Sequence, residues 1–237
     1  LLTMIKVIMK TALLGVFSLM AWVSGSLGFN IIIPLIKYLG GISLGVVIVM
    51  VLMIAITAAY VRVNPFKLAA KLGNMTLVAA TTTSSAISLP VKMEDSENKL
   101  GVSKKISNLV NPLGMVLNSA GQAIFLSMGS IMIAQFFHID MTLGRTIQVV
   151  AISTLACMGT LAVPGGALII LASLMPTLGL PAEGIAILAS VDWFRGMITT
   201  IPNVDCDALI ALIIAKGEGE FNRDIFDGKV DPTKRDA

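Results

Sequence analysis

The sequence predicts an all-α integral membrane protein in which two re-entrant hairpins enter the bilayer from opposite sides. Mean hydropathy is +0.89, and only 13% of the residues are charged, against about 25% in soluble domains. Several apolar runs reach the roughly 18 residues that mark a membrane-spanning helix. Two further apolar segments are too short to cross alone and are interrupted by small residues, hydroxyl residues and proline. Together these observations favour a multi-pass membrane fold with broken helices.

The first two predicted spans cover residues 11–29 and 35–60. Lys6 and Lys10 precede the first, and Arg62 follows the second. Basic residues flank membrane spans mainly on the cytoplasmic side, so both of these ends are expected to be cytoplasmic. The chain opens directly in apolar sequence, and we expect an N-terminal part of the protein to precede it.

Residues 66–105 form the first unit that is too short to span. An apolar helix over 66–80 leads into a tip at 81–90, which is rich in threonine and serine, and then into a charged stretch at 92–105. Basic residues occur at both ends, namely Lys67, Lys71, Lys92, Lys99, Lys104 and Lys105. Both ends are therefore expected to be cytoplasmic and the tip to lie inside the membrane. Non-helical backbone is tolerated there only where it is buried in protein or lines a cavity.

The next predicted span covers residues 109–137 and is interrupted at its middle by Gly114, Asn118, Gly121 and Gln122. A second short unit follows, with arms at 146–155 and 167–174 around a tip at 157–166. Its flanks carry few basic residues, so it is expected to enter from the outside. This arrangement is the inverted-repeat pattern of secondary transporters, which bind their substrates at the midplane between broken helices.

The last predicted span, residues 185–215, carries Asp192, Arg195, Asn203, Asp205 and Asp207 and returns to the cytoplasm. The charged tail at 216–237 is expected to remain cytoplasmic. Cys157 and Cys206 both lie in apolar surroundings and are predicted to be free thiols. No basic face with interleaved aromatic residues occurs, so nucleic acid is not an expected partner.

Two pairs of residues suggest a cation site. Asn203 and Asp207 are four residues apart on one helix face, and Gly114 and Asn118 have the same spacing on the preceding span. A carboxylate inside the membrane is costly unless it is paired, and a hard cation such as sodium takes carboxylate, amide and freed backbone oxygens. The alternative is that Asp207 is a solvated acid at the inner mouth of the protein.

The two hairpin tips suggest an anion site. Free N–H groups at helix N-termini attract a carboxylate, so Ser84, Ser85 and the backbone of 163–166 are candidates to hold an anionic substrate group. The alternative is that these small residues form a packing interface. Arg195 is three residues from Asp192, so it either pairs with that carboxylate or faces the substrate.

Four motifs in register carry a resemblance to a known family. They are the tip that ends Ser88-Leu89-Pro90-Val91, the stretch Pro112-Leu113-Gly114 with Asn118-Ser119-Ala120-Gly121, the tip from Met158-Gly159-Thr160 to Val163-Pro164-Gly165, and Asn203-Val204 followed by Asp207. They resemble the dicarboxylate/amino acid:cation symporter family, which has the glutamate-transporter-like fold. The resemblance covers nearly the whole chain.

The resemblance implies a homotrimer that works by an elevator mechanism, with helices one to four lying outside this sequence. Residues 1–33 would be the fifth helix, in the scaffold domain, and residues 34–215 the transport domain. That domain would hold helix six, the first hairpin, helix seven, the second hairpin and helix eight. The membrane-embedded protein would bind a small carboxylate or amino acid together with sodium, without another cofactor.

The resemblance also implies the binding residues. One sodium site would be Gly114, Asn118, Asn203 and Asp207, and a second would lie near Val116, Cys157, Met158 and Thr160. The substrate would contact Ser84, Ser85, Ala86, Gln122, Val163, Pro164, Gly165, Gly196, Thr199, Thr200 and Asn203.

Several positions depart from the family pattern. Ala120 stands where relatives have an aspartate that helps to hold a further sodium, and Ser119 stands where they have methionine. Gly196 and Thr199 stand where carriers of acidic amino acids have an aspartate and an arginine, and Thr83 replaces the arginine of the first tip. A second substrate carboxylate then lacks its bidentate partner unless Arg195 supplies it.

The predicted function is therefore sodium-driven symport of a small carboxylate or amino acid, with a neutral amino acid favoured over glutamate or aspartate. The alternatives are a C4-dicarboxylate or proton-coupled carrier of the same family, a channel, or a member that does not transport. An intramembrane aspartyl hydrolase is disfavoured. Its two carboxylates must converge on one water, whereas Asp205 and Asp207 are two residues apart on one helix and point in different directions.

Overall fold

The computed structural model describes residues 17–18, 21, 25, 32–158 and 165–230, so most of the predicted first span and the end of the tail lie outside the described residues. The described chain is helical. Its helices are α2 (Ile32–Val61), α3 (Pro65–Thr82), α4 (Ser85–Asn98), α5 (Lys104–Leu117), α6 (Ala120–Phe136), α7 (Leu143–Ala156), α8 (Gly166–Leu178), α9 (Gly184–Ala189), α10 (Asp192–Gly217) and α11 (Arg223–Asp227).

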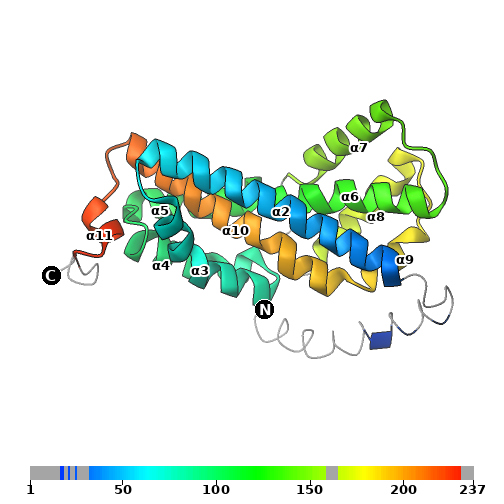
Figure 1. Cartoon of the computed structure of the whole chain (residues 1–237), viewed down its shortest axis with the longest axis horizontal. Coiled ribbons are helices and arrows are strands. Elements are labelled where there is room, and N and C mark those ends of the chain that lie inside the picture. The colour runs from blue at the N-terminus through cyan, green and yellow to red at the C-terminus, as the bar shows by residue number, and fades with distance from the viewer. Residues whose placement is uncertain (1–16, 19–20, 22–24, 26–31, 159–164, 231–237) are drawn as a thin grey trace.

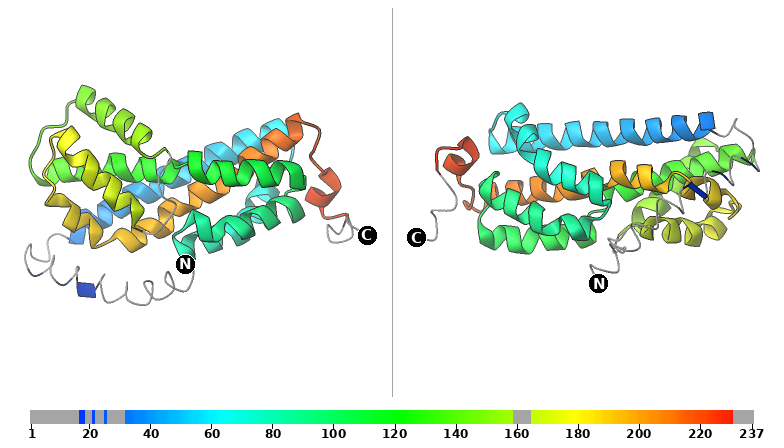
Figure 2. Two further views of the ribbon diagram at one scale, coloured as in Figure 1. Left: turned by 180° about the vertical axis from the view of Figure 1, so that it is seen from behind. Right: turned by 90° about the horizontal axis from the view of Figure 1, so that it is seen from below.

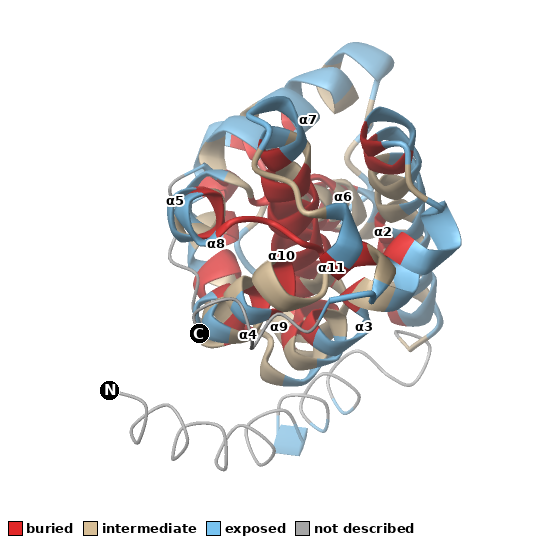
Figure 3. Cartoon of the chain, turned by 90° about the vertical axis from the view of Figure 1, so that its left-hand side faces the viewer, coloured by how far each residue is buried: buried red, intermediate tan, exposed pale blue. Residues whose placement is uncertain are grey.

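Helix α10 is the central element, and its buried residues lie in the middle of the molecule with the other helices around it (Figure 3). Helix α2 runs along it (Figure 1) and exposes apolar side chains such as Leu44, Val51 and Leu52 on its outer side. Its 30 residues rise about 45 Å, more than the roughly 30 Å of a bilayer core. Within the described part of the chain, three segments are long and apolar enough to span: Ile32–Val61, Lys104–Phe136 and Asp192–Gly217.

The two predicted hairpins lie at opposite ends of the molecule. Helices α3, α4 and α5 gather at the end next to α11, whereas α7, α8 and α9 occupy the other end (Figures 1 and 2). Helix α3 turns back into α4 near the middle of the molecule, and the C-terminal end of α7 and the start of α8 also lie toward the middle (Figure 1). Short helical units therefore lie at both ends of the molecule, and most of the predicted second tip, residues 159–164, lies outside the described residues.

The first hairpin tip is shorter than the sequence predicted. Helix α3 continues to Thr82, and α4 already begins at Ser85, so most of the expected tip at 81–90 is helical. Thr81 and Thr82 donate their hydroxyls to backbone carbonyls one turn earlier, at 2.8 and 2.7 Å, which removes the demand for a polar loop. The Ser84 hydroxyl caps α4 by accepting from the N–H of Ile87 at 3.4 Å.

The break in the third predicted span is confirmed. Helix α5 ends at Leu117 and α6 begins at Ala120, with extended backbone at Asn118 between them. The predicted last span at 185–215 needs a correction, because it is divided into α9 and α10 at Ser190–Val191. The Ser190 hydroxyl donates to the carbonyl of Ile187 at 2.6 Å and ends the short helix. Both cysteines are free thiols, as expected.

Candidate functional site

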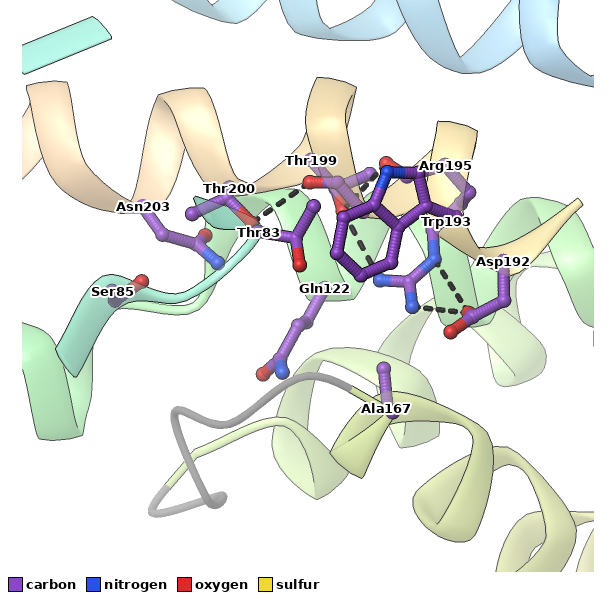
Figure 4. A pocket seen from close by; sticks show the side chains of 12 residues that line it. Thr83, Ser85, Gln122, Ala167, Asp192, Trp193, Arg195, Thr199, Thr200 and Asn203 are labelled. Carbon is purple, nitrogen blue, oxygen red and sulfur yellow. Dashed lines mark hydrogen bonds and ion pairs between the residues drawn. The ribbon is translucent and has the colours of Figure 1, made fainter. Parts of the chain in front are cut away.

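A pocket lies where the first hairpin tip, the start of α6, the start of α8 and the first turns of α10 meet (Figure 4). Its lining is mostly polar although it lies inside an apolar protein. The residues that line it are Thr83, Ser85, Gln122, Gly165, Ala167, Asp192, Trp193, Arg195, Gly196, Thr199, Thr200 and Asn203.

The structure brings together much of the predicted substrate set. The predicted residues that line the pocket are Ser85, Gln122, Gly165, Gly196, Thr199, Thr200 and Asn203. Ser84 is buried beside the tip and Ala86 is exposed, and neither is among the lining residues. Val163 and Pro164 lie outside the described residues.

Trp193 also lines the pocket, beside Arg195 (Figure 4). Asp192, Gly196, Thr199 and Asn203 recur at intervals of three to four residues, which places them on one face of α10. That spacing is the sequence signal for the α10 side of the pocket. Trp193 lies off this spacing, and nothing in the pattern indicated it.

Arg195 supplies the pocket with a guanidinium group. Its Nη2 and Nε both donate to Oδ1 of Asp192, and its Nη1 donates to the Thr199 hydroxyl at 3.2 Å. The guanidinium also lies 4.2 Å from the centre of the Phe125 ring. Arg195 thus pairs with Asp192, as the first alternative predicts, and it also lines the pocket. The pair leaves this side of the pocket with one positive and one negative group.

Two glycines allow the helices to meet closely around the pocket. A Cβ on Gly121 would lie 1.8 Å from the carbonyl oxygen of Thr199, so α6 begins almost in backbone contact with α10. A Cβ on Gly196 would lie 3.3 Å from Cβ of Thr83. The absence of a side chain at Gly196 therefore lets α10 pass beside the hairpin tip. This packing role is separate from the effect on substrate choice that the sequence comparison with the family suggested.

Two helix N-termini meet at the pocket. Ser84 is the N-cap of α4, and Gly165 is the N-cap of α8, with a φ of +80° and no side-chain hydrogen bond to the helix. N–H groups in the first turn of a helix carry partial positive charge and suit an anionic group. Thr83, between α3 and α4, has a left-handed φ of +51°, which is unfavourable for a β-branched residue. Among the described residues its buried hydroxyl has no hydrogen-bond partner.

The predicted sodium ligands Gly114, Asn118, Asn203 and Asp207 also meet, close to the pocket. Asn118 donates its amide to Oδ1 of Asp207 at 2.8 Å and to the carbonyl of Asn203 at 3.3 Å. A Cβ on Gly114 would lie 2.6 Å from Cγ of Asp207, so α5 and α10 are in close contact there. Asp207 is fully buried, which excludes the alternative of a solvated acid at a helix end.

Asp207 has an ionic partner that was not among the predicted site residues, Lys92. Lys92 was assigned to the cytoplasmic flank of the first hairpin, but it is 0% exposed. Its Nζ donates to Oδ2 of Asp207 at 2.5 Å and to the carbonyl of Asn111 at 3.0 Å. A signal was present, because Ser85, Ser88 and Lys92 follow the three- and four-residue spacing of one helix face.

The second predicted sodium group lies at two helix C-termini. Val116 is in the last turn of α5, Cys157 caps the end of α7, and Met158 follows it. Thr160 lies outside the described residues. The last carbonyls of a helix lack intrahelical partners, which makes such ends sources of oxygen ligands.

Comparison with known proteins identifies similar sequences along almost the whole chain. Residues 1–217 match the model of the sodium:dicarboxylate symporter family. The chain is 32% identical to a proton/glutamate-aspartate symporter of Bacillus subtilis, over 92% of the chain and 52% of the relative. It is 30% identical to C4-dicarboxylate transport protein 1 of Ralstonia nicotianae, over 92% and 51%, and 32% identical to bovine neutral amino acid transporter A, over 65% and 29%. The chain thus spans about half the length of the bacterial relatives it matches, or less of the bovine one.

Proposed function

Because the chain belongs to the sodium:dicarboxylate symporter family, we propose that it forms the substrate-binding part of a cation-coupled symporter for a small amino acid or carboxylate. The observation that carries this proposal is the polar pocket enclosed by two hairpins and α10 within a multi-pass membrane protein. The pocket places two helix N-termini beside the partly buried ion pair of Arg195 and Asp192. A solute with its own carboxylate can replace its hydration shell with these groups.

A neutral amino acid is the substrate class that the pocket charges favour. The N-termini of α4 and α8 offer N–H groups for the substrate carboxylate. Asp192 lines the pocket, and its Oδ2 can accept from the ammonium group while its Oδ1 accepts from Arg195 and neutralises the guanidinium. The site therefore has no uncompensated cation for a second substrate carboxylate.

A C4-dicarboxylate is the second candidate, and Arg195 is the observation that favours it. The guanidinium lines the pocket and reaches the Thr199 hydroxyl, so it lies one helical turn from the position at which related carriers of acidic substrates have arginine. Released from Asp192, it would bind a carboxylate with two parallel hydrogen bonds. The matched proteins include relatives named for each candidate substrate: one for neutral amino acids, one for C4-dicarboxylates and one for glutamate and aspartate.

Uptake into proteoliposomes by the full-length protein decides between the candidates. Radiolabelled alanine, serine, aspartate and succinate are offered with an inward sodium gradient, an inward proton gradient, or neither. Concentrative uptake of alanine or serine supports the first candidate, and uptake of succinate or aspartate supports the second. If neither gradient drives concentrative uptake of any of these substrates, cation-coupled symport is rejected.

Variants of Arg195 sharpen the decision. Arg195→Gln removes a charge-assisted hydrogen bond worth about 1.5–3 kcal/mol, so succinate uptake should fall by roughly ten- to hundredfold in kcat/KM if the guanidinium holds a substrate carboxylate. Arg195→Lys keeps the charge without the planar fork and should recover only part of that loss. Loss of alanine uptake alone in Arg195→Gln would contradict the dicarboxylate assignment.

The remaining parts of the proposal come from the resemblance. We place the transport domain at 34–215, the scaffold helix at 1–33, and the C-terminal tail at 216–237 in the cytoplasm. A homotrimer that moves its transport domains like elevators follows for the same reason. Cross-linking of the purified protein in detergent tests the trimer, and protease protection of the tail in sealed vesicles tests its side.

A further inference from the structure

We propose that Lys92 is a tethered cation that takes the place of sodium at Asp207, so the Asp207 group of this chain does not bind a co-transported alkali ion. The inference rests on the proposed function only in that it concerns ion coupling. Whether sodium binds at Asp207 can be tested without measuring transport. It arises from the Lys92–Asp207 pair, which the sequence pattern of sodium ligands did not include.

Charge neutrality at Asp207 is the first argument. Lys92 and Asp207 are both fully buried, and the ammonium lies 2.5 Å from the carboxylate. A buried carboxylate requires one positive charge nearby, and Lys92 provides it within the same protein. A sodium ion at the same carboxylate would add a second positive charge beside the ammonium, where water is not available to screen the repulsion.

The orientation of the surrounding groups is the second argument. A hard cation needs several oxygen ligands, but Asp207 receives hydrogen-bond donors on both of its oxygens, from Lys92 and from the amide of Asn118. The amide oxygen of Asn118 faces the N–H of Ala120 at 3.3 Å, and the amide oxygen of Asn203 accepts from the N–H of Gly121 at 2.8 Å. The groups around Asp207 are therefore hydrogen-bond donors that hold its carboxylate, and they do not leave its oxygens open to a metal ion.

The anchoring of Lys92 is the third argument. The ammonium also donates to the carbonyl of Asn111 on α5, so it is fixed by two helices other than its own. It extends from α4 in the first hairpin, and therefore links this hairpin to α5 and α10. A sodium ion enters and leaves in each transport cycle, whereas Lys92 is covalently part of the chain. Coupling to sodium in this protein would then use the other group, near Val116 and Cys157.

Sodium titration of the purified full-length protein without substrate tests the proposal. The melting temperature is followed from 1 to 100 mM sodium at constant ionic strength with choline, for wild type, Lys92→Met and the double variant Lys92→Met/Asp207→Asn. The double variant carries neither charge and reports the sodium response of all other sites. Lys92→Arg, which keeps the positive charge, is the matched control.

Wild type, Lys92→Arg and the double variant should show the same sodium response, because none of them offers a free carboxylate at 207. Lys92→Met should show an additional saturable rise in melting temperature, because sodium then compensates Asp207. The proposal is overturned if the sodium-dependent rise in melting temperature of the wild type exceeds that of the double variant by as much as the rise for Lys92→Met does. It is equally overturned if Lys92→Met and the double variant respond alike. Uptake measured in parallel reports separately on the proposed transport function.

Discussion

The buried ion pair between Lys92 and Asp207 leads to a prediction about stability. Asp207→Asn leaves the ammonium of Lys92 without its counter-charge at a position that is 0% exposed. At the observed N–O distance of 2.5 Å the Coulomb attraction is about 7 kcal/mol for an effective dielectric constant of 20. Desolvation of both groups offsets much of it, and removal of one partner of a buried pair typically costs about 3–5 kcal/mol.

The two single variants should lose different amounts of unfolding free energy, and the double variant should regain most of the loss. Lys92→Met should cost less than Asp207→Asn, because the remaining carboxylate keeps the hydrogen bond from Asn118 and can acquire a proton. Lys92→Met/Asp207→Asn removes both charges of the pair together, and its free energy of unfolding should lie within about 2 kcal/mol of the wild-type value. The coupling energy of the double-mutant cycle should therefore be several kcal/mol.

Equilibrium unfolding in mixed micelles of a nonionic detergent and dodecyl sulfate, in sodium-free buffer, measures these four free energies. The reasoning is refuted if Asp207→Asn lowers the free energy of unfolding by less than about 1 kcal/mol, which is the contribution of an exposed ion pair. Strict additivity of the two single variants would refute it as well, because two groups that do not interact give no coupling energy.

Two further predictions concern a residue beside the pocket and a residue that lines it. Gly121→Ala should abolish the yield of folded protein in size-exclusion chromatography, because its Cβ would lie 1.8 Å from the Thr199 carbonyl, whereas Gly144→Ala, with nothing within 4 Å, should leave the yield unchanged. Thr83→Gly should raise the free energy of unfolding by about 1 kcal/mol by relieving a left-handed φ, and should raise the KM for uptake by removing a pocket hydroxyl. Thr83→Ser should restore the KM, and a Thr83→Gly protein with unchanged KM would show that the hydroxyl does not touch substrate.

The sequence predicted those parts of the site that follow a local helical spacing. Asn203 and Asp207 are one turn apart, Gly114 and Asn118 are one turn apart, and the structure joins the two pairs through the Asn118 amide. The broken helix at Asn118 was also predictable, because small and polar residues interrupt an otherwise apolar span. These features depend on a few neighbouring residues, which a single sequence shows directly.

Features that depend on contacts across the fold were not predictable in this way. Lys92 lies among basic residues that flank a membrane segment, and its position along the chain alone suggests a solvated side chain. It is buried because α5 and α10 enclose it, and these contacts join residues 19 and 115 positions apart in the sequence. The length of the first tip was overestimated for a related reason. Threonine hydroxyls can bond to helix carbonyls, so a hydroxyl-rich stretch does not by itself require a loop.

A chain of hydrogen bonds connects the pocket to the buried ion pair. Asn203 lines the pocket, its side chain accepts from the N–H of Gly121, and its carbonyl accepts from the amide of Asn118. The same amide donates to Asp207, which holds Lys92. A substrate that draws Asn203 toward itself therefore disturbs the donors around the carboxylate, and Lys92 transmits the disturbance to the first hairpin. Because contiguous bonded groups can carry coupling between sites, this path would link substrate binding to hairpin position without an ion at Asp207.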